Sequence, residues 1–133
     1  MTRYFTPEEA NALLPVVRPL VEEMVERRRV QVAAEEREET LGVRIAGNGS
    51  GIEPGEPARV SEELDEAVRE LAATVDRLNE LGVQVKDLDT GLVDFPALRE
   101  GEEVLLCWQL GEEEIAWWHR PEDGFAGRRP LPF

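Results

Sequence analysis

Residues 61–88, SEELDEAVRELAATVDRLNELGVQVKDL, contain the change of pattern that decides the fold. In the first part, apolar side chains recur every three or four residues and predict one buried stripe on a helix: Leu64, Val68, Leu71, Val75 and Leu78. Ser61 suits the N-cap of this helix and Gly82 suits its end. From Val83 the apolar period becomes two, which predicts a β-strand. The sequence therefore predicts an α+β fold in which a helix leads directly into an antiparallel sheet.

A partner for this helix is predicted upstream. Residues 6–9, TPEE, combine an N-cap threonine, a proline at the first helical position and a capping-box glutamate. The apolar stripe that follows consists of Leu13, Val17, Leu20, Val21 and Met24. Glu23 and Arg27 have the spacing of an ion pair along one helix. Pro15 and Pro19 each remove a backbone donor, so a break or kink is predicted between residues 14 and 18.

The connection between the two helices is rich in glycine and proline. Gly42 predicts the end of the first helix, and residues 43–60 predict a flexible loop. A phosphate-binding role for the glycines is not supported, since no strand precedes them and no GK[ST] motif follows. The two helices should therefore form a long antiparallel hairpin over residues 6–82.

Residues 83–119 predict a small antiparallel meander of about four strands. The expected strands cover residues 83–88, 92–95, 104–110 and 114–119. Pro96 should end the second strand or lie at an edge, because proline cannot donate to a ladder. The tail, residues 120–133, is rich in Pro, Gly and Arg and predicts an ordered coil on the surface. The whole chain, residues 1–133, should form one domain.

The register of the last hairpin decides which side chains share a face. If Gly111-Glu112 is a two-residue loop, Cys107 lies opposite Ala116 and Leu105 lies opposite Trp118. Strand alternation then points Cys107 away from His119. Both faces of this hairpin are apolar, and the helices cover only one of them. The second face, which would carry Leu105, Cys107 and Trp118, needs a cover, either the tail or a second subunit.

Composition excludes several classes of partner. The formal net charge of -14 repels polyanions, so nucleic-acid binding is not expected. No stretch approaches the roughly 18 apolar residues of a membrane span, and the N-terminus has no apolar core of a secretory signal. A single cysteine, Cys107, permits no intramolecular disulfide. These features predict a cytoplasmic location without a membrane partner.

Several motifs together resemble a prokaryotic family known as domain of unknown function 2203. They are FTPEEAN at Phe5–Asn11, GLVDFP at Gly91–Pro96, LCW at Leu106–Trp108, LGE at Leu110–Glu112, WH at Trp118–His119 and GFAGR at Gly124–Arg128. The combination is specific and spans nearly the whole chain, skipping only the glycine-rich loop. The resemblance implies a shared fold, and the family has no established activity to carry over.

The candidate catalytic residues are His119, Glu112 and Asp94. His119 is the only histidine, and it follows two tryptophans at a strand end. It suits a general base or metal ligand, or a structural role in which it bonds a carbonyl of the tail. Asp94 lies in an apolar strand, where the structural alternative is a cross-strand ion pair with Lys86.

The candidate ligand-binding residues are Arg128 and Trp118. Arg128 suits either a ligand anion or a structural clamp on Glu112 or Asp94, and Trp118 suits either a stacked ligand or the core. No metal site is predicted, because Cys107 should point away from His119 and the chain offers one residue of each type. Asp87 and Asp89 have a spacing that is common in turns and gives only a weak magnesium signal.

The functional hypothesis that ranks first is a small binding or interaction module that acts as a homodimer, with no cofactor and with an unknown small-molecule ligand. The alternative is a small metal- or histidine-dependent enzyme, a hydrolase or isomerase, with its site around His119, Glu112, Asp94 and Arg128. The two hypotheses differ in whether these four side chains converge on one cleft.

Overall fold

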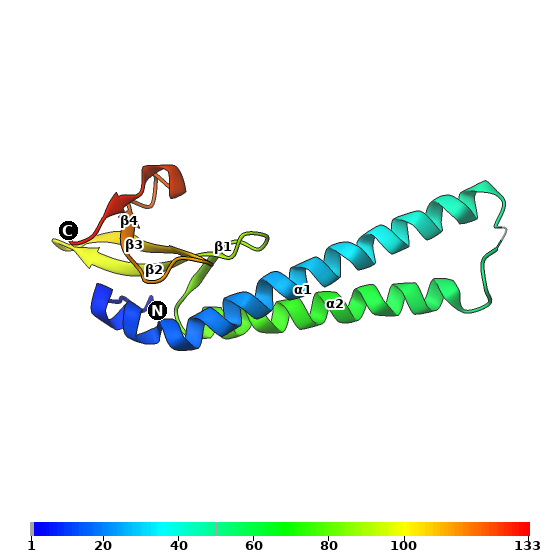
Figure 1. Ribbon diagram of the computed structural model, residues 1–133, viewed down its shortest axis with the longest axis horizontal. Helices are drawn as coiled ribbons and strands as arrows, with labels where there is room; N and C mark the ends of the chain where they lie inside the picture. Colours follow the sequence, from blue (N-terminus) through cyan, green and yellow to red (C-terminus); the bar gives the residue numbers. More distant parts are fainter. Residues whose placement is uncertain (1, 50) are drawn as a thin grey trace.

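The computed structural model describes residues 2–49 and 51–133, which form a helical hairpin and a sheet (Figure 1). The helices are α1 (Pro7–Gly47) and α2 (Glu56–Glu80). The strands are β1 (Gln84–Asp87), β2 (Leu92–Arg99), β3 (Glu102–Gln109), β4 (Trp117–His119) and β5 (Arg129–Pro130), with a 3-10 turn, η1 (Phe125–Gly127), before the last. The predicted α+β fold is confirmed. The antiparallel sheet has five described strands, because part of the tail is not coil but pairs with β4.

Helix α1 begins where the sequence predicts. It continues through residues 14–18, where a break or a kink was predicted. The Thr6 hydroxyl accepts from the Glu9 amide at 3.1 Å, and the Glu9 carboxylate accepts from the Thr6 amide at 3.0 Å. The helix runs through Pro15 and Pro19 and bends in its blue part rather than ending (Figure 1). Both prolines are exposed, while Val17 between them is buried against the sheet. Tertiary packing on the apolar side therefore outweighs the missing backbone donors.

The loop at the hairpin tip is shorter than predicted. Helix α1 includes Gly42 and continues to Gly47, and α2 begins at Glu56 rather than at Ser61. Arg44 explains the extension, because its guanidinium donates to the Gly51 carbonyl at 2.7 Å and to the Glu56 carboxylate at 3.3 Å. These contacts close the tip in place of a side-chain cap on α2. The predicted loop also includes Ser50, which lies outside the described residues.

The buried stripe of α2 differs from the predicted one at two positions, and at each of them the buried residue is the one just before the predicted residue. Leu71 and Leu78 are buried as predicted, but Val68 is 45% exposed. Ala67 and Thr74 take the buried positions next to α1. The small Ala67 side chain allows the helices to approach, and the Thr74 hydroxyl donates to the Glu70 carbonyl at 3.2 Å within its own helix. The seven-residue repeat was correctly predicted, while its phase was wrong for Val68.

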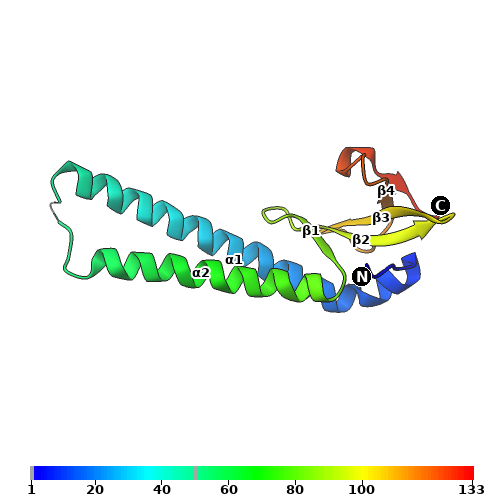
Figure 2. The ribbon, with the colours of Figure 1, turned by 180° about the vertical axis from the view of Figure 1, so that it is seen from behind.

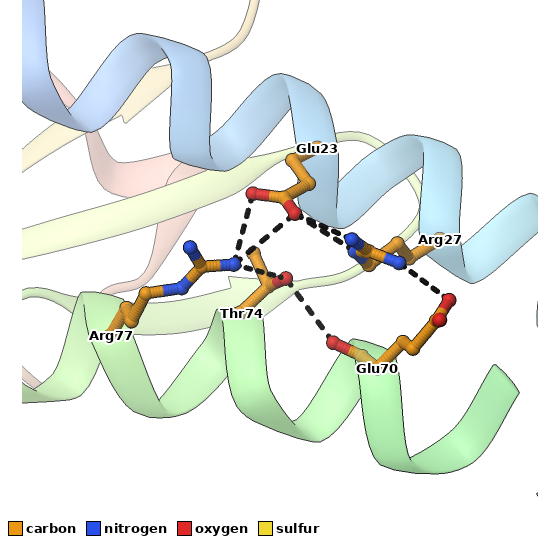
Figure 3. A network of polar contacts seen from close by, with 5 residues as sticks. All are labelled: Glu23, Arg27, Glu70, Thr74 and Arg77. Atoms are coloured by element: carbon orange, nitrogen blue, oxygen red, sulfur yellow. Dashed lines mark hydrogen bonds and ion pairs between the residues drawn. The ribbon is translucent and has the colours of Figure 1, made fainter. Parts of the chain in front are cut away.

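An ion-pair network joins the two helices where they leave the sheet (Figure 3). Glu23 of α1 pairs with Arg27 one turn along at 2.8 Å, as its spacing predicts, and with Arg77 of α2 at 3.1 Å. Arg27 also reaches Glu70 of α2 at 2.6 Å. Hydrogen bonds from Arg27, the largest cause, and the charges of both arginines lower the pKa of Glu23 from its ordinary value of 4.5. No described helix is both long and apolar enough to cross a membrane.

The main core lies between the sheet and the half of the hairpin nearest to it, while the rest of the hairpin projects beyond the sheet (Figure 2). Val17, Val21 and Met24 of α1 and Leu78 of α2 are buried in this core. The sheet contributes Phe95, Leu106, Trp108 and Trp118, whose side chains lie on the inner face. Strand β2 continues through Pro96 to Arg99, four residues beyond its predicted end.

The register between β3 and β4 differs by one residue from the prediction. Cys107 lies opposite Trp117 rather than Ala116, and Leu105 lies opposite His119 rather than Trp118. The connection is a wide loop, because side chains of α1 hold it open. Arg18 donates to the carbonyls of Glu112 at 3.1 Å and Glu113 at 2.9 Å. A shift of one residue exchanges the two faces of β4 relative to β3. Trp118 and His119 therefore each lie on the face of the sheet opposite to the predicted one.

Candidate functional site

Three polar side chains from three strands meet on the face of the sheet that points away from the helices, called here the outer face. Asp94 of β2 lies opposite Cys107 of β3, and His119 of β4 lies opposite Leu105, two residues along β3. Residues directly opposite each other share a face, as do residues two apart on one strand. The observed register therefore places Asp94, Cys107 and His119 on the same side. The prediction that Cys107 points away from His119 was wrong.

His119 and Asp94 form a buried pair. Nε2 of His119 lies 3.2 Å from each carboxylate oxygen of Asp94, and the two residues are 3% and 2% exposed. Nδ1 of the same ring lies 2.8 Å from the Arg120 carbonyl oxygen. A carbonyl can only accept, so Nδ1 donates and the tail carbonyl fixes the orientation of the ring. This contact matches the structural role that was one of the alternatives for His119.

Cys107 completes the cluster. One ligand atom from each of Asp94, Cys107 and His119 lies within 4.8 Å of the other two, and all three residues are buried. Burial, and to a smaller extent the Asp94 charge, raises the pKa of the Cys107 thiol to about 12. The thiol is therefore protonated at neutral pH in the absence of a metal ion and is not an activated nucleophile. A raised thiol pKa disfavours thiolate catalysis of the kind in which a histidine draws the proton from an adjacent cysteine.

A small cavity of about 180 Å³ adjoins the pair. Asp94 and His119 bound it on one side, and Pro121, Gly124 and Phe125 of the tail bound it on the other. The tail thus lies over the outer face within a single chain. The tail therefore covers this part of the second apolar face, and Leu105 is only 6% exposed beneath it.

The family model described as "Uncharacterized conserved protein (DUF2203)" matches residues 3–131, a range that contains the whole cluster. The chain belongs to the DUF2203 family. No curated protein and no solved structure matches it. The suspected family is confirmed, and the site of this DUF2203 chain is interpreted from its own geometry.

The second pair on the outer face of the DUF2203 chain joins Glu112 and Arg128. Nη2 of Arg128 donates to the Glu112 carboxylate at 2.7 Å, and the other Glu112 oxygen accepts from the Gln109 amide at 2.7 Å. The Arg128 guanidinium lies over the rings of Trp117, at 5.0 Å, and Phe125, at 4.7 Å. These contacts fasten the tail to the β3–β4 loop. The pair has the geometry of the clamp that was one of the alternatives for Arg128.

The four residues of the enzyme hypothesis therefore form two pairs rather than one cleft. Glu112 and Arg128 do not line the cavity beside His119 and Asp94. The alternative in which Asp94 lies opposite Lys86 was wrong, because Asp94 lies opposite Gln84 and the register of β1 shifts between Val85 and Asp87. The register of β4 against β3 could not be read from the sequence, since the contacts that hold the β3–β4 loop come from α1.

Trp118 and the two turn aspartates do not join this cluster. Trp118 lies opposite Leu106 on the inner face and packs edge-on against Phe133 with 5.6 Å between ring centroids. Asp87 accepts from the backbone amides of the β1–β2 turn, which lower the pKa of its carboxyl group, and Asp89 pairs with Arg28 at 3.1 Å. Their carboxylates therefore cap and anchor a turn.

Proposed function

We propose that this DUF2203 protein is a small cytoplasmic binding module that acts as a homodimer. The observation that carries the proposal is an apolar groove at the end of the sheet, called here the terminal groove. It has a volume of about 620 Å³, which is within the range of about 300–1,000 Å³ that is usual for ligand sites. Its apolar lining includes Tyr4, Phe5, Leu98, Ile115, Leu131 and Phe133.

Exposed apolar side chains mark the terminal groove as a contact surface. Tyr4 is 43% exposed, Leu98 is 50% exposed and Phe133 is 43% exposed, and all three line the same hollow. A contiguous apolar patch with a polar rim is typical of an interaction site. The outer face is a poorer candidate for the interface, because the tail lies over it and Leu105 there is only 6% exposed.

Charges around the terminal groove favour a second copy of the chain as the occupant. Glu8, Glu9 and Glu114 line it. Arg99 and Arg129 lie over the ring of Trp118, at 4.9 Å and 5.4 Å, and this ring packs against Phe133 of the groove. A two-fold interface brings the same patch together twice, so it needs both signs of charge in one patch. The projecting hairpin is a poorer candidate, because acidic residues far outnumber arginines there and two copies would repel.

Sedimentation velocity with the intact chain tests the proposal. Wild type should sediment as a dimer, and Leu98→Glu should sediment as a monomer that keeps the wild-type far-UV circular dichroism spectrum, because Leu98 is half exposed. The melting temperature of the variant should be lower than that of wild type, since association stabilises the folded state. Val43→Glu is the matched control, since Val43 is 68% exposed on the hairpin and far from the groove in the chain. A wild-type monomer at high concentration would refute the homodimer, and a dimeric Leu98→Glu would refute the terminal groove as its interface.

A nucleic-acid partner is not part of the proposal. The net charge of -14 supports this, because neutralising phosphates requires a basic surface. A mobility-shift assay at low salt should therefore show no micromolar binding to DNA or RNA.

A further inference from the structure

The outer face brings together three kinds of metal-binding atom. Asp94 offers a carboxylate oxygen, Cys107 a sulfur and His119 an imidazole nitrogen, and these atoms lie within 4.8 Å of one another. Each residue is at least nine-tenths buried. A mixed set of oxygen, nitrogen and sulfur donors suits Zn²⁺ and related transition metals better than Mg²⁺ or Ca²⁺.

The hydrogen bonds of His119 require a cation between the ring and Asp94. Nδ1 carries a proton, because it lies 2.8 Å from the Arg120 carbonyl, which can only accept. Nε2 lies 3.2 Å from both oxygens of the Asp94 carboxylate. With the ring neutral and Asp94 ionised, the Nε2 lone pair would face a carboxylate in a buried site, which is unfavourable. A proton or a metal ion must therefore be shared between the two side chains.

We propose that this shared cation is a divalent transition-metal ion of the Zn²⁺ class, bound by Asp94, Cys107 and His119. A tetrahedral zinc ion with bonds of about 2.0–2.3 Å holds its ligand atoms about 3.3–3.8 Å apart. The 3.2 Å separation of nitrogen and oxygen is already close to this spacing. The Cys107 sulfur lies within 4.8 Å of the other two ligand atoms, so an approach of at most about 1–1.5 Å brings it to this spacing.

The surroundings of the three ligands fit such an ion. A metal-bound histidine usually donates its second nitrogen to a backbone carbonyl, which is the position of the Arg120 carbonyl here. The 180 Å³ cavity at Asp94 and His119 has room for water or a small anion as a fourth ligand. A site with three protein ligands and one open position is the arrangement of catalytic zinc centres.

Charge is balanced when the ion binds. The S–H bond of Cys107 breaks, a sulfur–metal bond forms and the proton leaves to solvent, as does any proton on Nε2. The thiolate and the carboxylate then offset the two positive charges of the metal, so no net charge is buried. Arg128 is partly buried, and its charge is offset by Glu112, which pairs with it at 2.7 Å. Lys86 lines the cavity but its side chain is exposed to water.

Cobalt spectroscopy on the reduced, chelator-treated wild-type protein tests the site directly. The chain has one cysteine and one histidine, so a thiolate-to-cobalt charge-transfer band with the intensity of one site per chain identifies Cys107 without any substitution. One Co²⁺ per chain should give this band together with the strong visible bands of four-coordinate cobalt. Zn²⁺ should displace the cobalt, and excess Mg²⁺ should not.

Variants locate the other ligands. Cys107→Ser and Asp94→Asn should weaken Zn²⁺ binding by more than the roughly 10–100-fold that loss of an outer-shell partner costs. Glu103→Gln, an exposed change on β3, is the control and should bind as wild type does. Zinc should also raise the melting temperature of wild type and of Glu103→Gln, because a ligand that binds only the folded state stabilises it.

The outcome of the cobalt titration decides the proposal even if a variant fails to fold. A folded, reduced wild type without the charge-transfer band at excess Co²⁺ would overturn it, and the shared cation would then be a proton in a histidine–aspartate ion pair. Cobalt binding that lacks the band and is displaced by Mg²⁺ would have the same meaning, because it would report surface carboxylates. The cobalt result does not bear on the proposed homodimer, since Asp94, Cys107 and His119 do not line the terminal groove.

Discussion

Asn11 of α1 and Ile115 of the β3–β4 loop are joined by two hydrogen bonds, although 104 positions separate them in the chain. The Asn11 amide nitrogen donates to the Ile115 carbonyl at 3.1 Å, and its amide oxygen accepts from the Ile115 N–H at 2.8 Å. The side chain thus pairs with the loop as a neighbouring strand would. Together with Arg18, it fixes the loop that sets the register of β4.

Removing this amide should destabilise the protein. Asn11→Ala leaves a backbone donor and acceptor of the loop unpaired, so we expect a loss of about 1–3 kcal/mol of unfolding free energy. Urea unfolding measures this. Asn79→Ala is the control, because Asn79 is exposed on α2 and no hydrogen bond of its side chain is described. Equal stability of Asn11→Ala and wild type would show that the loop holds its shape without α1.

The phase of the α2 stripe can be tested by two aspartates three positions apart. Leu71→Asp places a charge at a site that is 6% exposed and should cost several kcal/mol. Val68→Asp places the same charge at a site that is 45% exposed and should change stability by less than about 1 kcal/mol. Thermal unfolding monitored by circular dichroism measures both. A large effect at Val68 with a small one at Leu71 would mean that the other phase is correct.

Acid should weaken the hairpin through Glu23. The folded-state pKa of this carboxyl group lies below its ordinary value of 4.5, so its contribution to stability is present above pH 4.5 and is lost as the pH falls through the folded pKa. Glu23→Gln should therefore be less stable than wild type at pH 7, by about 1 kcal/mol for a partly exposed network. The difference should shrink below pH 4.5. The exposed Glu22→Gln is the control, and a Glu23→Gln difference that is constant with pH would refute this account.

The tail should loosen when its clamp is removed. Arg128→Ala removes the 2.7 Å hydrogen bond to Glu112 and the contact between the guanidinium and the Trp117 ring. We expect faster hydrogen exchange over residues 120–133 and a loss of about 1.5–3 kcal/mol of unfolding free energy, the range for a hydrogen bond to a charged group. Glu122→Gln, an exposed change in the same segment, should leave exchange unchanged. Unaltered protection in Arg128→Ala would mean that other contacts hold the tail.

Local signals in the sequence were enough for both helices and the first three strands, but not for β5 in the tail or for how the faces of the elements meet. The Thr6 capping box, the seven-residue repeat of α2 and the switch of period at Val83 act over a few residues, and all three were predicted correctly. The placement of Val68 and Cys107 depended on neighbours far away in the chain. Ala67 replaces Val68 because a small side chain permits close helix packing. Cys107 lies on the same face as His119 because Asn11 and Arg18 hold open the β3–β4 loop, which was predicted to have only two residues.

The two edges of the sheet have a consequence for how the protein behaves when it is concentrated. Strand β1 has four residues and a bulge, and β5 has two residues, one of them Pro130. Short, irregular or proline-containing edges offer few free backbone groups for a foreign strand to pair with. The apolar run of β3 lies at the centre of the sheet, where β2 pairs with its whole length and β4 pairs with Leu105, Leu106 and Cys107. The fold therefore protects its most amyloid-prone segment by its position in the strand order rather than by charge.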